Sequence, residues 1–206
     1  MQETNNLFDV NGRCIPLTSN YPVHNKSRRY FTIEPPKIDY ELIYNKIKNF
    51  LDPKTDLSLE DFKKRSLEII EKLANDSKLK NITKGVSVPF FLPKIKSTNI
   101  GTDLTEKYLY ALTQSYKDEN PKYDFINYCQ ENLSETITIN SESKHDKLIS
   151  KMETETIVGC YFPCMLEYSF PAAFETLSGL PKNFYLAGGF DTCAAFIGSP
   201  NLLLNT

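Results

Sequence analysis

Hydrophobic residues recur at helical spacing in two segments of the first half of the chain. In residues 39–51 and 58–74, apolar side chains three or four positions apart would share one face of a helix. Asp39 and Ser58 stand at the start of these runs, and both residue types accept hydrogen bonds from the free N–H groups of a first helical turn. Pro53 stops the first run, because proline disfavours the helical conformation of the residue before it. The pattern predicts a helix over each segment.

The middle of the chain repeats this spacing. An apolar stripe covers residues 103–117, where Asp103 and Glu106 have the separation of a capping box. A second apolar run begins at Pro121, a residue favoured in the first helical turn, and continues to about Leu133. We expect two helices here, packed against each other as a hairpin.

Other segments have an extended pattern. Residues 85–93 are apolar and contain prolines, which suit an edge strand, and residues 136–140 and 183–187 also read as short strands. A polar connector at 141–147 then leads into a short helix near 147–155. Together these elements predict an α+β fold that is rich in helix and has a small, mostly antiparallel sheet.

The domain organisation follows from proline content and length. Residues 1–38 contain four prolines, so we expect an irregular N-terminal arm. Residues 39–206 are long enough to bury a core without a metal or a disulfide, and we expect them to form a single globular domain.

Charge is distributed very unevenly. The chain has 24 Lys and Arg and 26 Asp and Glu. Within residues 157–206 the charged residues are only Glu167, Glu175, Lys182 and Asp191. A segment this apolar must be covered by the rest of the chain or by a partner. We interpret it first as core-forming, because buried apolar sequence is usually core. The alternative is that part of it is a protein-binding surface.

Composition excludes several classes of protein. The net charge of −2 argues against a general nucleic-acid binder, which needs a positive field. The longest apolar runs are too short to cross a bilayer, and no secretory signal is recognised, so we expect a soluble cytoplasmic protein. The five cysteines should then be reduced. Cys160 and Cys164 are close in sequence, but zinc-finger spacing is absent, and neither a metal nor a cofactor is expected.

Residues 187–200, AGGFDTCAAFIGSP, have the start and stop signals of a short helix. Asp191 is expected to be its N-cap, residues 192–197 its body, and Gly198 and Pro200 its end. Backbone donors at such a start can hold an anion. The glycine spacing matches no phosphate-binding pattern, however, and the aspartate would compete for the same donors.

Two sets of residues are candidate sites. Cys193 would lie near the positive end of this helix, which favours a thiolate, with His24 or His145 as a base, although its neighbours and Asp191 favour a buried, inert thiol. A basic and aromatic run could bind single-stranded nucleic acid or an acidic protein, and it consists of Lys26, Arg28, Arg29, Tyr30 and Phe31.

No catalytic motif is assembled in the sequence, and this absence shapes the functional hypotheses. The leading hypothesis is a non-enzymatic protein–protein interaction protein, such as an adaptor or a subunit that assembles a complex. The alternatives are a small thiol-dependent enzyme that uses Cys193 and a nucleic-acid binder that uses residues 26–31. An exposed apolar patch would favour the first, and a cleft at Cys193 would favour the second.

Overall fold

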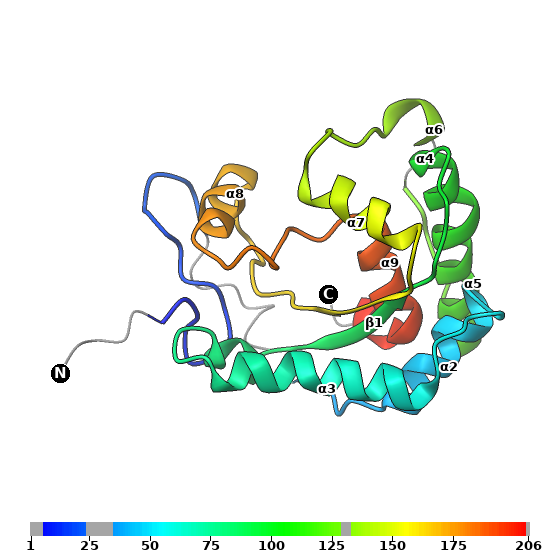
Figure 1. Cartoon of the computed structure of the whole chain (residues 1–206), viewed down its shortest axis with the longest axis horizontal. Coiled ribbons are helices and arrows are strands. Elements are labelled where there is room, and N and C mark those ends of the chain that lie inside the picture. Colours follow the sequence, from blue (N-terminus) through cyan, green and yellow to red (C-terminus); the bar gives the residue numbers. More distant parts are fainter. Residues whose placement is uncertain (1–5, 24–34, 129–132, 205–206) are drawn as a thin grey trace. The chain divides into compact units, whose positions relative to one another are not determined.

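A computed structural model describes residues 6–23, 35–128 and 133–204 (Figure 1). The chain falls into two compact units, each assembled from three stretches of sequence. The first unit contains residues 1–38, 67–88 and 162–186, and the second contains residues 39–66, 89–161 and 187–206. The division into an arm and one domain stays a prediction.

The second unit contains most of the regular structure. Its helices are α2 (Tyr40–Phe50), α4 (Ile100–Asp103), α5 (Tyr110–Glu119), α6 (Leu133–Thr136), α7 (Lys144–Met152) and α9 (Gly189–Gly198), with a π-helical stretch at Leu104–Leu109 and a 3-10 turn at Pro200–Leu204. Its sheet is a two-stranded antiparallel pair of β1 (Val88–Leu92) and β2 (Ile157–Tyr161). Helix α8 (Phe170–Ser178) and a 3-10 turn at Lys80–Lys84 belong to the first unit, and α3 (Leu59–Asn75) continues from the second unit into the first. The predicted helix-rich α+β fold is confirmed.

The first two predicted helices are confirmed with their caps. The Asp39 carboxylate accepts a hydrogen bond from the N–H of Leu42 at 3.0 Å and starts α2. The Ser58 hydroxyl accepts from the N–H of Asp61 at 3.1 Å and starts α3. Both caps satisfy N–H groups that have no partner inside the helix.

The third helix begins earlier than predicted. Asn99 caps it by accepting from the N–H of Thr102 at 2.9 Å, so α4 starts at Ile100 and the helical chain runs on through the π-helical stretch into α5. Asp103 is therefore not a cap. Its carboxylate is buried, accepts from the Ser97 hydroxyl and pairs with Lys107.

The predicted helix from Pro121 is wrong over residues 121–128, which form a turn followed by irregular chain. Asn120 ends α5, and the N–H of Tyr123 closes the turn onto the Asn120 carbonyl at 3.0 Å. Phe125 packs its ring against Tyr116, with ring centroids 5.6 Å apart. Phe125 therefore contacts α5 from irregular chain, and the expected hairpin is absent from the part of the chain that the structure describes.

Two predicted strands and one helix boundary are also wrong. Residues 137–140 and 183–187 are not in strands, and the strand that pairs with β1 is 157–161. Helix α7 starts at Lys144, because the Ser143 hydroxyl accepts from the N–H of Asp146 at 3.1 Å. The segment expected as a polar connector therefore supplies the first turn of α7.

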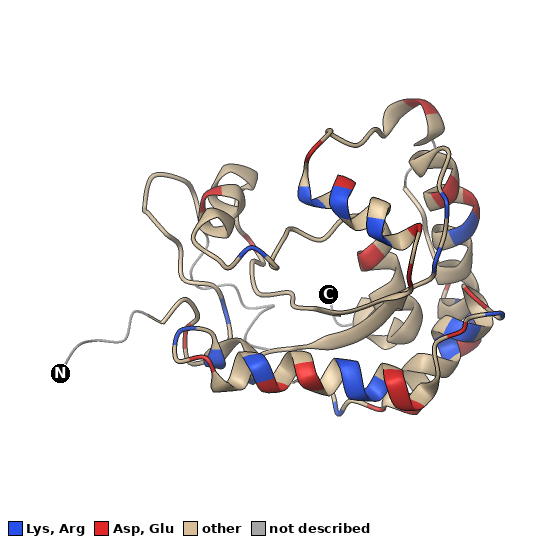
Figure 2. Cartoon of the chain, viewed as in Figure 1, with Lys and Arg blue, Asp and Glu red and all other residues tan. Residues whose placement is uncertain are grey.

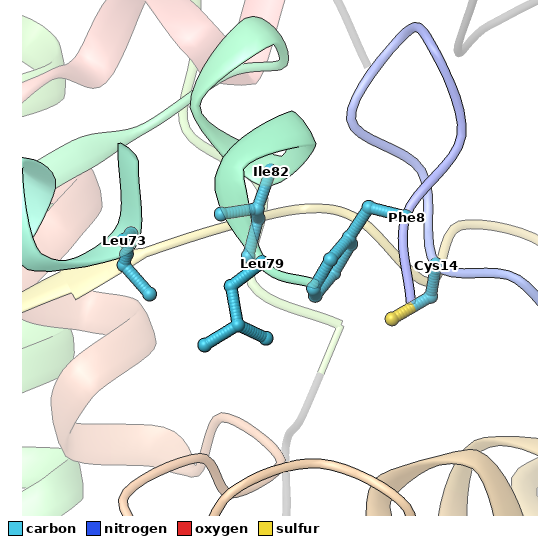
Figure 3. Close-up of a cluster of buried hydrophobic side chains, with 5 residues drawn as sticks. All are labelled: Phe8, Cys14, Leu73, Leu79 and Ile82. Carbon is cyan, nitrogen blue, oxygen red and sulfur yellow. The ribbon is translucent and has the colours of Figure 1, made fainter. Parts of the chain in front are cut away.

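The core of the first unit depends on its N-terminal segment. Phe8 and Cys14 are almost completely buried and pack with Leu73, Leu79 and Ile82 (Figure 3). The described part of this segment, residues 6–23, contains no helix and supplies two of these five core side chains.

The core of the second unit is aromatic. The Phe62 ring packs near those of Tyr44 and Phe91, with centroids 5.9 and 5.8 Å apart, and the ring of Tyr108 stacks on Phe190 at 4.2 Å. Among the described residues, no helix has both the length and the apolar character needed to cross a membrane.

Candidate functional site

Cys193 is a buried thiol inside α9. Only 5% of it is exposed. Burial and, to a lesser extent, the negative charge of Asp191 together raise the pKa of the Cys193 thiol to about 12. Since the thiolate is the nucleophilic form, little of it exists at neutral pH. These observations favour the interpretation of Cys193 as a packing residue.

At the start of α9, a side chain of the helix itself accepts a hydrogen bond from the backbone. The prediction that Asp191 is the N-cap is wrong: Gly188 is the N-cap, and Asp191 lies three residues later. The Asp191 carboxylate accepts from the N–H of Gly188 at 2.7 Å. This arrangement occupies a donor that an anion would need, so it does not favour the anion-binding interpretation. Two glycines made the start of the helix hard to place from the sequence.

Of the two histidines, the structure describes only His145. His145 lies in the first turn of α7, and a Cβ added to Gly188 would be 2.7 Å from its Nε2, so the imidazole packs directly against the start of α9. His24 lies outside the described residues, as do the basic and aromatic candidates Lys26, Arg28, Arg29, Tyr30 and Phe31.

A pair of thiols that the sequence did not predict lies in the first unit. Residues 9–13 form a tight turn in which Gly12 has a φ of +81° and its N–H donates to the Asp9 carbonyl at 3.1 Å. This turn brings Cys14 back beside Phe8 as an antiparallel bridge. The Cys14 N–H then donates to the Cys164 carbonyl at 2.9 Å, and the two Sγ atoms are 4.0 Å apart.

The surroundings of Cys14 hold the pair in place. The Tyr168 hydroxyl donates to the Cys14 carbonyl, and the Arg13 guanidinium lies 5.8 Å from the centre of the Tyr168 ring. Arg13 is buried and donates from Nη2 to the Leu166 carbonyl at 3.2 Å. The hydrogen bond with Cys164, followed by burial, raises the pKa of the Cys14 thiol far above its ordinary value. Cys14 therefore remains a protonated thiol at neutral pH.

Cys164 differs from Cys14 in its access to solvent. It is half-buried and lines a cavity of about 160 Å³. The cavity wall also includes Gly12, Gly85 and Lys84. A small molecule in this cavity would contact Cys164 and not Cys14, which is buried and does not line the cavity.

Exposed aromatic side chains gather around α8. Phe170 is 82% exposed and Phe174 is 62% exposed, and their separation of four residues puts both on one side of the helix. The N-terminal segment lies alongside and exposes Leu17 and Tyr21. We call these four residues the arm–α8 face.

Three contacts tie the N-terminal segment to α8. The Thr18 hydroxyl donates to the Glu175 carboxylate at 2.6 Å, and the N–H of Ser169 donates to the Pro22 carbonyl at 3.1 Å. Val23 and Tyr168 form an antiparallel bridge. The arm–α8 face is therefore a surface of the first unit, built from segments about 150 residues apart.

No cluster of three or more His, Cys, Asp or Glu side chains in the described parts of the chain could hold a metal ion. Comparison of the chain with protein-family models, with curated proteins and with solved structures found no match.

Proposed function

We propose that the protein is a non-enzymatic interaction protein that docks another protein on the arm–α8 face. The observation that carries the proposal is the exposure of Phe170 and Phe174 on one side of α8. Single exposed apolar residues are ordinary, but a group of them on adjacent segments is typical of a contact surface.

The scarcity of charge on this face supports the same proposal. Helix α8 carries one charged residue, Glu175, and its ribbon is otherwise tan in Figure 2. The Glu175 carboxylate is already hydrogen-bonded to Thr18. A partner would therefore gain most from apolar and aromatic contacts, and we expect it to present an apolar segment.

The contribution of this face to the binding free energy can be estimated from the two phenylalanines. A phenylalanine contributes roughly 150–250 Å² of burial. Covering the exposed parts of Phe170 and Phe174 would remove roughly 300 Å² from water, which corresponds to about 7 kcal/mol before the costs of association. Truncation of one such anchor typically costs at least about 2 kcal/mol of binding free energy.

The alternatives have weaker support. Cys193 is buried and protonated, which does not favour the thiol-enzyme hypothesis. The residues of the nucleic-acid hypothesis lie outside the described part of the chain. The proposal also includes a cytoplasmic location, a compartment in which protein disulfides are usually transient.

Photo-crosslinking from defined positions tests the proposal. A benzoyl-phenylalanine at position 174 would be compared with one at position 110, because Phe174 and Tyr110 are both 62% exposed and Tyr110 lies in the other unit. We expect an adduct with one partner from position 174 and none with that partner from position 110. Purified partner should then bind the Phe170→Ala variant at least about 10-fold more weakly than the wild type.

Two results would contradict the proposal. One is the recovery of the same adducts from positions 174 and 110, which would mean indiscriminate contact. The other is equal affinity of the purified partner for the wild type and for the Phe170→Ala variant. An adduct with a second copy of the chain would assign the face to self-association instead.

A further inference from the structure

We propose that Cys14 and Cys164 form a reversible disulfide by exchange with a small-molecule disulfide that carries carboxylate groups and reaches Cys164 through the adjacent cavity. This inference is independent of the arm–α8 face as a docking surface. It rests on the position of the two sulfur atoms, on the difference in their access to solvent, and on the residues that line the cavity.

The geometry favours closure of this pair. The Sγ atoms are 4.0 Å apart, and a disulfide needs them at about 2.05 Å. The hydrogen bond from the Cys14 N–H to the Cys164 carbonyl, at 2.9 Å, already holds the two backbones side by side. Side-chain rotation and a small backbone adjustment are therefore enough to bring the sulfurs together.

The other described cysteines are placed differently. Cys160 lies in β2 and Cys193 in α9, both in the second unit. Burial raises the pKa of each of these two thiols to about 12. They serve as internal controls, because we expect both thiols to exchange slowly with a small-molecule disulfide.

The order of the two steps follows from access. Cys164 lines the cavity, whereas Cys14 is fully packed, and its raised pKa keeps it protonated. The Cys164 thiolate attacks one sulfur of the reagent, the reagent S–S bond breaks, and one small thiolate leaves and takes up a proton. Cys14 then attacks Cys164 Sγ, the proton of Cys14 passes to the small thiolate that leaves, and the second small thiol is released. Two protein thiols are oxidised, and one reagent disulfide is reduced to two thiols.

The cavity lining indicates the charge of the reagent. Lys84 is on its wall, and none of its lining residues is an aspartate or a glutamate. A carboxylate on the entering disulfide would be attracted by the Lys84 ammonium, and a cationic reagent would be repelled. The volume of about 160 Å³ suits a small thiol or the cysteinyl end of a larger one.

Peptide mapping of the full chain tests the proposal. The reduced protein would be exposed to dithiodiacetate, quenched with acid, alkylated and digested, so that each cysteine is followed by mass. We expect a peptide that links Cys14 to Cys164 to appear before Cys160 or Cys193 reacts, and to disappear with dithiothreitol. The Cys14→Ser variant should stop at a mixed disulfide on Cys164, whereas Cys193→Ser should behave as wild type.

A separate comparison tests the predicted preference of the cavity for an anionic reagent. Rates with dithiodiacetate, an anion, would be compared with rates with cystamine, a cation of similar size. Lys84→Gln should lower the anion-to-cation ratio by about 2- to 5-fold, as expected for a partly solvated charge. Lys80→Gln is the matched control, because Lys80 lies in the same 3-10 turn but does not line the cavity, and it should leave the ratio unchanged.

The wild-type time course can overturn the proposal without any variant. Absence of the linked peptide, when Cys164 has been fully converted to a mixed disulfide, would show that Cys14 cannot reach it. Modification of Cys160 or Cys193 before Cys164 would show that the cavity gives no access. Equal anion-to-cation ratios for wild type and Lys84→Gln would remove the assignment of a carboxylate-bearing reagent.

Discussion

Replacement of Asp191 by asparagine should change how stability depends on pH. Asp191 is buried at the start of α9, and its carboxylate accepts from the N–H of Gly188. Burial raises the pKa of this carboxyl from 3.8 to about 6, against the opposing effect of the backbone hydrogen bonds. Asparagine offers the same acceptor oxygen without a charge, so it should keep the cap and remove the titration.

The direction of this pH dependence follows from which state of the chain, folded or unfolded, releases the Asp191 proton at lower pH. Between pH 3.8 and about 6, the unfolded chain has released this proton while the folded chain keeps it. The folded state then binds more protons, so the contribution of Asp191 to the free energy of unfolding falls as the pH rises. A pKa difference of about 2 corresponds to about 3 kcal/mol, and this loss is complete above the folded-state pKa.

Urea unfolding followed by circular dichroism measures the difference between Asp191→Asn and wild type at several pH values. The advantage of the variant should grow by about 2.5 kcal/mol between about pH 4 and about pH 7. Asp39→Asn is the matched control, because Asp39 is an exposed cap and asparagine caps a helix equally well. A difference between Asp191→Asn and wild type that stays constant with pH, or that shrinks as the pH rises, would refute the reasoning.

Four further predictions concern packing and reactivity. Gly12→Ala should destabilise the protein by more than about 2 kcal/mol in urea unfolding, because φ is +81° and the new Cβ would lie 2.5 Å from the Gly85 nitrogen. Gly179→Ala, whose Cβ would meet a flexible leucine end at 3.3 Å and the Thr176 carbonyl oxygen at 3.5 Å, should cost less than about 1 kcal/mol. Phe62→Ala should cost about 3–5 kcal/mol in the same assay, since the ring is fully buried among other aromatics. Cys193 should react with iodoacetamide more slowly than a free thiol at neutral pH, and a rate equal to that of glutathione would contradict its burial.

Local signals allowed the first helices to be predicted. Asp39 and Ser58 act on N–H groups three residues away, so a short window of sequence contains everything that determines these caps. The same reasoning placed a cap wrongly at Asp103. Asn99 caps this helix earlier, and the Asp103 carboxylate instead accepts a hydrogen bond from Ser97 and pairs with Lys107.

Apolar periodicity was least informative where the chain is irregular. The run after Pro121 has the composition of a helix face, yet its Phe125 packs on Tyr116 from irregular chain. Tertiary contact decided the conformation of this segment, and a weak helical preference did not. The short alternation at 136–140 did not form a strand either, since the partner of β1 is the more apolar segment 157–161.

The thiol pair shows which kind of site a single sequence conceals. One local signal was available: Asn11-Gly12 is a typical turn pair, and it predicts that the chain returns on itself between Phe8 and Cys14. Nothing local connects Cys14 with a residue 150 positions later. The two meet because separate stretches build the first unit, and both the thiol pair and the arm–α8 face are assembled from the N-terminal segment and residues 162–186. The segment predicted as an irregular N-terminal arm therefore contributes residues to both proposed sites.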